Sequence, residues 1–150
     1  MRTSVFTSDE PKATFELGER LGSMLRGGEV ILLKGPLGAG KTLFTKGILD
    51  ALGFDAAEVT SPSFTLVNRY DADLRVYHVD LWRIEDPGGA AFSVGLEELL
   101  EDEEAVIVIE WAERLGGFEF GSEPIRVDIS GDGESPREIK ITGGIEPDGV

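Results

Sequence analysis

The clearest chemical signal in the chain is the sequence GPLGAGKT at residues 35–42. It fits the phosphate-binding pattern of glycine, four variable residues, glycine, lysine and a hydroxyl residue at every specified position. Glycine lets the backbone turn tightly, so that successive N–H groups point toward one anion. Lys41 would place a positive charge on the outer phosphates, and the Thr42 hydroxyl is a hard oxygen ligand that suits Mg²⁺. The stretch therefore predicts a nucleotide phosphate site; the alternative is a glycine-rich turn with an incidental lysine.

Two carboxylates end predicted strands and could complete such a site. Glu110 follows AVIVI at residues 105–109, an apolar and mostly β-branched run typical of a buried central strand. A hydrophobic strand that ends in an acid is the other half of a phosphate-loop site, because its carboxylate reaches Mg²⁺ directly or through water. Asp80 ends a second predicted strand, where it either reaches a bound ligand or caps the strand end. We therefore expect Glu110 at a metal and Asp80 near the ligand.

Four hydroxyl residues around a proline, Thr60, Ser61, Ser63 and Thr65, have two interpretations, and the last three are the candidate site residues. Ser61, Ser63 and Thr65 follow the first strand–loop–helix unit, and hydroxyl groups in such a loop contact Mg²⁺ and the γ-phosphate in known switches. The same composition also suits a turn that leads into a strand. His78 is the only histidine; it shares a strand face with Asp80, and we expect it to be a packed residue rather than a ligand.

Apolar periodicity and turn residues predict the elements that position these groups. A buried strand at residues 30–33 precedes the glycine loop, and a helix follows at 41–52. This order directs the helix N-terminus at a bound phosphate. The other expected elements are a short strand at 4–7, an amphipathic helix at 12–26 capped by Ser8 or Asp9, a strand hairpin at 64–70 and 74–80, a short helix at 92–100, and a closing hairpin at 125–130 and 137–142.

These elements indicate an α/β fold. We expect a single three-layer domain of the P-loop NTPase type over residues 1–150, with a loose tail at residues 143–150. The buried strands favour a parallel core and the two hairpins add antiparallel strands, so the sheet should be mixed. The acidic cluster at residues 97–104 is expected to be a solvated face rather than a metal site.

The charge of the chain argues against direct nucleic-acid binding. Its 150 residues carry 29 acidic and 14 basic side chains, a net charge of −15, whereas affinity for nucleic acids depends on lysine and arginine at the phosphates.

The sequence has no cysteine, which excludes disulfides and thiolate metal sites. It has no run of 18 apolar residues that would cross a membrane, and its N-terminus lacks the apolar segment of a signal peptide. We therefore expect a cytoplasmic protein.

Taken together, these segments resemble the bacterial TsaE family. The resemblance rests on the glycine loop, on SPSFTLV at residues 61–67, on YHVDLWRI at 77–84, and on Glu110 followed by Trp111. The matching segments extend over residues 5–115; the first is common to all P-loop proteins, and the second and third are specific. The chain departs from the family pattern, without losing a proposed phosphate or metal ligand, at Ser63, Trp82, Ala112 and the segment GGAA at 88–91.

The resemblance implies a P-loop ATPase needed for N6-threonylcarbamoyladenosine at position 37 of tRNA. It implies that the protein works with TsaD, which transfers the threonylcarbamoyl group, and with TsaB, and that ATP hydrolysis resets a complex whose other members hold the tRNA. Intrinsic hydrolysis is expected to be slow and stimulated by these partners. By position, Asp80 would position or activate water, and Lys41 would serve the reaction beside the phosphates. Thr42 and Glu110 would hold Mg²⁺, and Pro11 would lie by the base. The residues that would bind phosphate are Gly35, Gly38, Ala39, Gly40, Lys41, Thr42 and Leu43.

Three other functions are compatible with a phosphate loop. A small-molecule or nucleotide kinase usually needs a mobile arginine-rich lid over the transferred group, and this chain offers only scattered arginines such as Arg69, Arg75 and Arg83. A GTP-dependent switch usually carries an Asn-Lys-x-Asp segment for guanine, which the sequence lacks. A nucleotide-dependent binding module without significant turnover would differ from the ATPase only when the partners are present.

Overall fold

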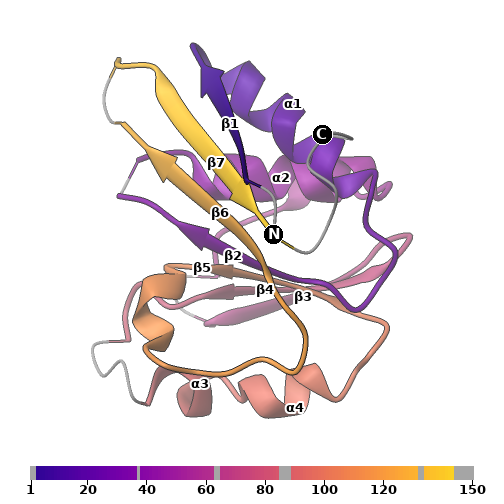
Figure 1. The fold of residues 1–150 in the computed structure, drawn as a ribbon. Coiled ribbons are helices and arrows are strands. Elements are labelled where there is room, and N and C mark those ends of the chain that lie inside the picture. Colours follow the sequence, from indigo (N-terminus) through magenta and orange to yellow (C-terminus); the bar gives the residue numbers. More distant parts are fainter. Residues whose placement is uncertain (1–2, 37, 63–64, 85–88, 132–133, 144–150) are drawn as a thin grey trace.

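The computed structural model describes residues 3–36, 38–62, 65–84, 89–131 and 134–143. Within these residues, helices cover both faces of a seven-stranded sheet with the order β1-β7-β6-β2-β5-β4-β3 (Figure 1). The strands are β1 Thr3–Ser8, β2 Val30–Lys34, β3 Val67–Asp71, β4 Arg75–Asp80, β5 Val106–Glu110, β6 Ile125–Ser130 and β7 Arg137–Thr142. The helices are α1 Pro11–Gly22, α2 Lys41–Ala51, α3 Ala90–Ser93 and α4 Leu96–Leu100, with 3₁₀ turns η1 Ala56–Glu58 and η2 Ala112–Leu115.

The middle of the sheet is parallel and its edges are antiparallel. β2 lies between β5 and β6 and is parallel to both, and β4 is parallel to β5. β3 runs antiparallel to β4, while β7 runs antiparallel to β6 and β1. This arrangement confirms the mixed sheet that the sequence predicts. In its register Glu110 lies opposite Leu33 of β2 and Asp80 of β4, so both carboxylates reach the sheet edge from which the glycine loop departs.

Two apolar clusters show why the molecule has three layers. α1 and α2 pack on one face of the sheet, where Leu21, Phe44 and Ile48 are fully buried against the strands. α3, α4 and η2 pack on the other face around Leu81, Leu96 and other apolar side chains (Figure 1). The four apolar residues of β5 alternate between the two clusters, and the whole strand is buried, as expected for a central strand covered on both sides. This confirms the α/β fold.

Glycine brings α1 and α2 into close contact. A Cβ atom on Gly18 would lie 2.3 Å from the Phe44 carbonyl oxygen, and one on Gly47 would lie 2.1 Å from the Phe15 carbonyl oxygen. Any larger residue would push the helix backbones apart, because neither carbonyl can move without disturbing its own helix. The close packing fixes α2, and therefore the loop at its N-terminus, against the first helix.

The first helix is shorter than predicted. The periodicity predicts a helix to residue 26, but α1 ends at Gly22 and the Ser23 hydroxyl donates to the Arg20 carbonyl. Met24 and Leu25 continue in a tighter turn, in which each N–H bonds to the carbonyl three residues earlier. Glycine weakens a helix interior, and the chain must leave the helix here to enter β2. The apolar residues beyond Gly22 pack on the core without being helical.

Two further local predictions were wrong. Neither Ser8 nor Asp9 caps α1; the N-cap residue is Glu10, without a side-chain cap bond, and the Ser8 hydroxyl contacts the Glu10 carbonyl and the Thr14 hydroxyl. The helix expected at 92–100 is divided into α3 and α4, because Gly95 adopts a left-handed conformation with φ of 67° between them. Most of the tail predicted at 143–150 lies outside the described residues. Within the described part of the chain, no helix has the length and apolarity needed to cross a membrane.

Candidate functional site

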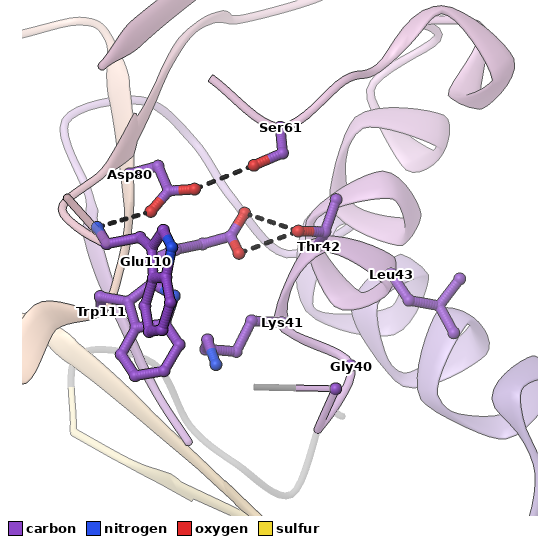
Figure 2. Close-up of a pocket in the computed structure, with 10 residues that line it drawn as sticks. Gly40, Lys41, Thr42, Leu43, Ser61, Asp80, Glu110 and Trp111 are labelled. Carbon is purple, nitrogen blue, oxygen red and sulfur yellow. Dashed lines mark hydrogen bonds between the residues drawn. The ribbon is translucent and has the colours of Figure 1, made fainter. Parts of the chain in front are cut away.

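A cavity of about 310 Å³ opens between the N-terminus of α2 and the carboxyl ends of β4 and β5. Ligands of open α/β sheets bind at this kind of position, where loops leave the carboxyl ends of the strands. Figure 2 shows that Thr42 and Glu110 point toward each other, that Asp80 points toward Ser61, and that the Lys41 side chain runs toward Trp111. The cavity is lined by Gly38, Gly40, Lys41, Thr42, Leu43, Ser61, Asp80, Trp82, Glu110 and Trp111.

The glycine loop leads directly into α2 and orients the helix N-terminus. Gly38 has φ of 80° and Gly40, the N-cap residue, has φ of 113°, values that strain other residues but not glycine. No side chain caps α2, so its first N–H groups need partners from outside the helix. Such N–H groups, together with the helix dipole, form an anion site. The loop and the N-terminus of α2 therefore have the local geometry of the phosphate site that the motif predicts.

Lys41 lies against the loop that precedes it. Its Nζ donates to the carbonyl oxygens of Gly35 at 2.5 Å and Pro36 at 2.8 Å, and it stands 3.9 Å from the centre of the Trp111 ring. The residue is only 5% exposed. Burial lowers the pKa of the Lys41 ammonium, and the attraction of Glu110 and other carboxylates opposes that shift. The ammonium is thus held in place before any ligand arrives.

Thr42 and Glu110 meet across the cavity. The Thr42 hydroxyl lies 2.9 Å from Glu110 Oε1 and 3.2 Å from Oε2, and it is the donor (Figure 2). A hydroxyl that donates one hydrogen bond keeps lone pairs on its oxygen, so Thr42 can still act as a ligand. Glu110 is only 2% exposed. The pair predicted at a metal is therefore in contact, although 68 residues separate the two positions.

Asp80 is the second buried carboxylate at the cavity, with 3% exposure. Its Oδ1 accepts the Trp82 backbone N–H at 2.9 Å, and its Oδ2 accepts the Ser61 hydroxyl at 2.9 Å. The bond to Trp82 is the strand-end cap that the sequence offered as an alternative, yet Asp80 also lines the cavity. The structure thus shows the strand-end cap and places the same carboxylate at the cavity.

The structure describes two of the three hydroxyl residues that were considered as a switch loop, and it places these two differently. Ser61 lines the cavity and bonds to Asp80. Thr65 donates to Asn68 Oδ1 at 3.0 Å and is not among the cavity residues. Ser63 lies outside the described residues. Only the first of the three is thus placed beside the other site residues.

A pair of tryptophans forms one wall of the cavity, and sequence reasoning gave neither a role. The rings of Trp82 and Trp111 have centroids 4.5 Å apart, and the Arg114 guanidinium lies over both. Trp82 is 38% exposed. Trp111 adopts φ of 59°, a conformation that costs a residue with a side chain about 1–2 kcal/mol. This backbone outlier, immediately after Glu110, could not be read from residue types.

A second hollow, of about 370 Å³, lies on the other side of the glycine loop. Pro11, predicted beside the base, is part of its wall, and Gly38, Gly40 and Leu43 border both hollows. Arg137 of β7 reaches the loop here and donates to the carbonyls of Gly38 and Ala39, each at 3.2 Å. Sequence reasoning missed Arg137, because its position beside the loop depends on the pairing of the final hairpin with the rest of the sheet.

The glycine loop also makes close contact with β6. A Cβ atom on Gly35 would lie 2.5 Å from the Ile129 carbonyl oxygen. Gly35 borders neither hollow, whereas Ala39 borders the second. The first glycine of the motif therefore allows β6 to pack against the loop, while its later glycines face the cavities.

Metal binding would depend on few protein groups. Among the described residues, no three histidine, aspartate or glutamate side chains are grouped as a metal site. The pair formed by Thr42 and Glu110 suits Mg²⁺, which usually takes one or two protein oxygens and completes its octahedron with water and phosphate. This chemistry agrees with the oxygen donors present.

His78 is buried as predicted, but its surroundings are not those of an ordinary core residue. It is fully buried, and its Nε2 makes a short contact with Glu110 Oε2. Its Nδ1 has no hydrogen-bond partner among the described residues. The sequence places His78 and Asp80 on one strand face; it gave no sign that the histidine contacts Glu110 on the neighbouring strand.

Comparison with known proteins gives consistent results. A sequence model of threonylcarbamoyl adenosine biosynthesis protein TsaE matches residues 8–139. The chain is 35% identical over 133 residues to the tRNA threonylcarbamoyladenosine biosynthesis protein TsaE of Bacillus subtilis, covering 88% of this chain and 80% of that protein. The protein of the same name from Treponema pallidum is 36% identical over 131 residues, covering 85% and 92%. The crystal structure of B. subtilis YdiB superimposes with a TM-score of 0.74 at 29% identity, covering 93% of this chain and 84% of that chain.

Proposed function

Because the chain belongs to the TsaE family of tRNA threonylcarbamoyladenosine biosynthesis proteins, we propose that it is a Mg²⁺-dependent ATPase of this pathway. The membership confirms the resemblance that the sequence predicts. The proposal adds that the protein binds ATP in the cavity at α2, hydrolyses it slowly alone, and works in the cytoplasm with TsaD and TsaB on N6-threonylcarbamoyladenosine at position 37.

The observation that carries the proposal is the convergence of an anion site and two carboxylates. The uncapped N-terminus of α2 and the Lys41 ammonium offer positive charge, whereas Asp80 and Glu110 offer negative charge across the same cavity. Two buried carboxylates would repel a nucleotide phosphate unless a cation came with it. The combination therefore suits a metal–nucleotide complex better than a free anion.

The residues present fit such a complex. Thr42 keeps oxygen lone pairs toward the cavity while it donates to Glu110, so these two residues would hold Mg²⁺. Bound Mg²⁺ would neutralise charge on the phosphate oxygens, as in other P-loop proteins. Lys41 has three N–H donors and uses two of them on loop carbonyls, which leaves one for an outer phosphate.

Asp80 is suited to orient the attacking water. Its two oxygens accept the Trp82 N–H and the Ser61 hydroxyl, which orients a carboxylate that lines the cavity. In hydrolysis the water oxygen bonds to the γ-phosphorus as the bond to ADP breaks, and Asp80 would accept or direct the water's proton. This assigns binding to Lys41, metal to Thr42 and Glu110, and water to Asp80.

The overall charge supports an accessory role. With a net charge of −15, the surface lacks the basic footprint that a tRNA-binding protein needs. We infer that TsaD and TsaB hold the tRNA and that this chain contacts it only through them. Adenine would lie in the second hollow beside Pro11, on the far side of the loop from Asp80.

Phosphate accounting tests this function against its alternatives. Mg-ATP labelled at the γ-phosphate should yield free phosphate as the only labelled product, and the yield should rise when TsaD and TsaB are added. Transfer of the label to an added acceptor would indicate a kinase instead. Preference for GTP in competition would indicate a GTP switch, and tight binding without partner-stimulated release would indicate a binding module.

A further inference from the structure

The buried contact between His78 and Glu110 is not explained by packing alone. His78 pairs with Val108 in the parallel register of β4 and β5, two residues before the pair formed by Asp80 and Glu110. Side chains two residues apart share a strand face, so the imidazole lies directly behind the Glu110 carboxylate. Val76 and Val108 on this face are buried in the core under α1 and α2. His78 therefore links this apolar core to the cavity.

The hydrogen-bond pattern around the imidazole defines its tautomer. Glu110 Oε2 lies against the imidazole Nε2, and both Glu110 oxygens face the Thr42 hydroxyl, so Nε2 is the ring nitrogen that can hydrogen-bond to this carboxyl group. A proton on Nδ1 would be a buried donor without a partner among the described residues, which costs more than the lone pair of an unprotonated nitrogen. The tautomer with its hydrogen on Nε2 therefore places the ring donor where the Glu110 carboxyl group lies.

This donor limits the motion of the Glu110 side chain. Without it, the Thr42 hydroxyl would be the one remaining side-chain hydrogen-bond partner of the carboxylate among the described residues. With it, Oε2 is fixed from behind by a rigid ring that is 0% exposed. Carboxylates that bind metals are commonly hydrogen-bonded by such outer groups, and loss of those groups weakens metal affinity about 10- to 100-fold.

We propose that His78 is a positioning residue: its Nε2–H holds the Glu110 carboxylate in the orientation that, with Thr42, binds the metal of the nucleotide complex. The inference rests on the proposed function, because it assigns a task to Glu110 within that site. His78 itself does not touch nucleotide or metal. Its contribution is therefore to Mg²⁺ dependence rather than to nucleotide affinity in the absence of metal.

The tautomer can be measured directly in the free protein. Because the chain has one histidine, an untagged sample labelled with ¹⁵N in histidine gives one set of imidazole signals by NMR. A proton on Nε2 whose signal shifts in Glu110→Gln supports the proposal. A proton on Nδ1 alone would leave Nε2 unable to donate and would overturn it. This test does not require any variant of His78 to fold.

Mg²⁺ titrations then test the role in the site. ATP binding is measured calorimetrically at increasing Mg²⁺ in wild type, His78→Phe, His78→Gln and Val76→Ala. His78→Phe, which lacks a donor, should need about tenfold more Mg²⁺ for half of the metal-dependent gain in affinity. His78→Gln, whose amide nitrogen can occupy the position of Nε2, should stay within about threefold of wild type. Val76→Ala removes buried atoms from the same strand face and should leave the Mg²⁺ midpoint unchanged.

The outcomes separate this inference from the function on which it rests. A folded His78→Phe with the wild-type Mg²⁺ midpoint, or His78→Gln as impaired as His78→Phe, would refute the positioning role and leave the ATPase proposal intact. Absence of Mg²⁺-dependent ATP binding in the wild type would refute both. A shift in Val76→Ala equal to that in His78→Phe would assign the effect to core packing and would also overturn the positioning role.

Discussion

Replacing Lys41 by methionine should weaken ATP binding by an amount that the structure sets. Methionine keeps most of the aliphatic stem and removes the ammonium, which lies over the Trp111 ring. Two of the three N–H donors of Lys41 are used on the Gly35 and Pro36 carbonyls, so one charge-assisted hydrogen bond to phosphate is lost. Such a bond contributes about 1.5–3 kcal/mol, which corresponds to about a 10- to 150-fold increase in Kd.

Intrinsic fluorescence is a direct assay for this prediction. The two tryptophans of the chain, Trp82 and Trp111, both line the cavity, so ATP titration should change their emission. Lys140→Met is the matched control, because Lys140 is exposed on β7 and its loss changes the net charge equally. The expected result is a weakened Kd for Lys41→Met and an unchanged one for Lys140→Met. If folded Lys41→Met binds ATP with a Kd within about threefold of wild type, the placement of the phosphate beside Lys41 is refuted. A threefold change in Kd corresponds to less than half of the smallest binding free energy that we expect to be lost.

Three other perturbations have defined outcomes. Trp111→Gly should be more stable in urea than Trp111→Ala by up to about 1 kcal/mol. Glycine adopts the positive φ of this position without strain, and part of that gain is offset because glycine also has more conformational freedom in the unfolded chain. Equal stability of the two variants would contradict the strain. Arg137→Lys should raise the Kd for ATP about three- to tenfold in calorimetry, since lysine cannot hold two loop carbonyls as the guanidinium fork does; an unchanged Kd would remove Arg137 from the site. Hydrogen bonds from Arg75 hold the pKa values of Asp71 and Asp102 below their usual range. These interactions stabilise the fold at any pH above the pKa of the carboxyls in the unfolded chain. The stabilisation is lost as the pH falls through their pKa in the folded protein. Arg75→Met should therefore lower Tm at pH 7, and the difference in Tm between wild type and variant should disappear below about pH 4. A difference in Tm that grows in acid would contradict this prediction.

The parts of the fold that could be predicted from sequence are those with strong local patterns. The closing hairpin was predicted at 125–130 and 137–142, and β6 and β7 have these bounds, because apolar and polar residues alternate in both strands. β5 was recognisable from its run of buried β-branched residues. The loop between β2 and α2 was recognisable because its glycines and lysine follow a fixed spacing.

The parts that could not be predicted depend on contacts between distant residues. Gly22, the last residue of α1, packs against the Ile48 backbone of α2, and periodicity in one segment carries no information about that neighbour. Arg137 reaches the glycine loop from 98 positions away in sequence. His78 contacts Glu110 only because β4 and β5 are adjacent in this register. Strand order therefore decided which residues joined the site.

The central claim is that the cavity hydrolyses ATP with Asp80 directing the water. The most direct test is phosphate release from Mg-ATP by wild type and Asp80→Asn, each alone and with TsaD and TsaB. We expect partner-stimulated release in the wild type and a loss of about 100-fold or more in Asp80→Asn, with ATP binding retained. Normal stimulated release by Asp80→Asn, or no release by the wild type with its partners, would contradict the account.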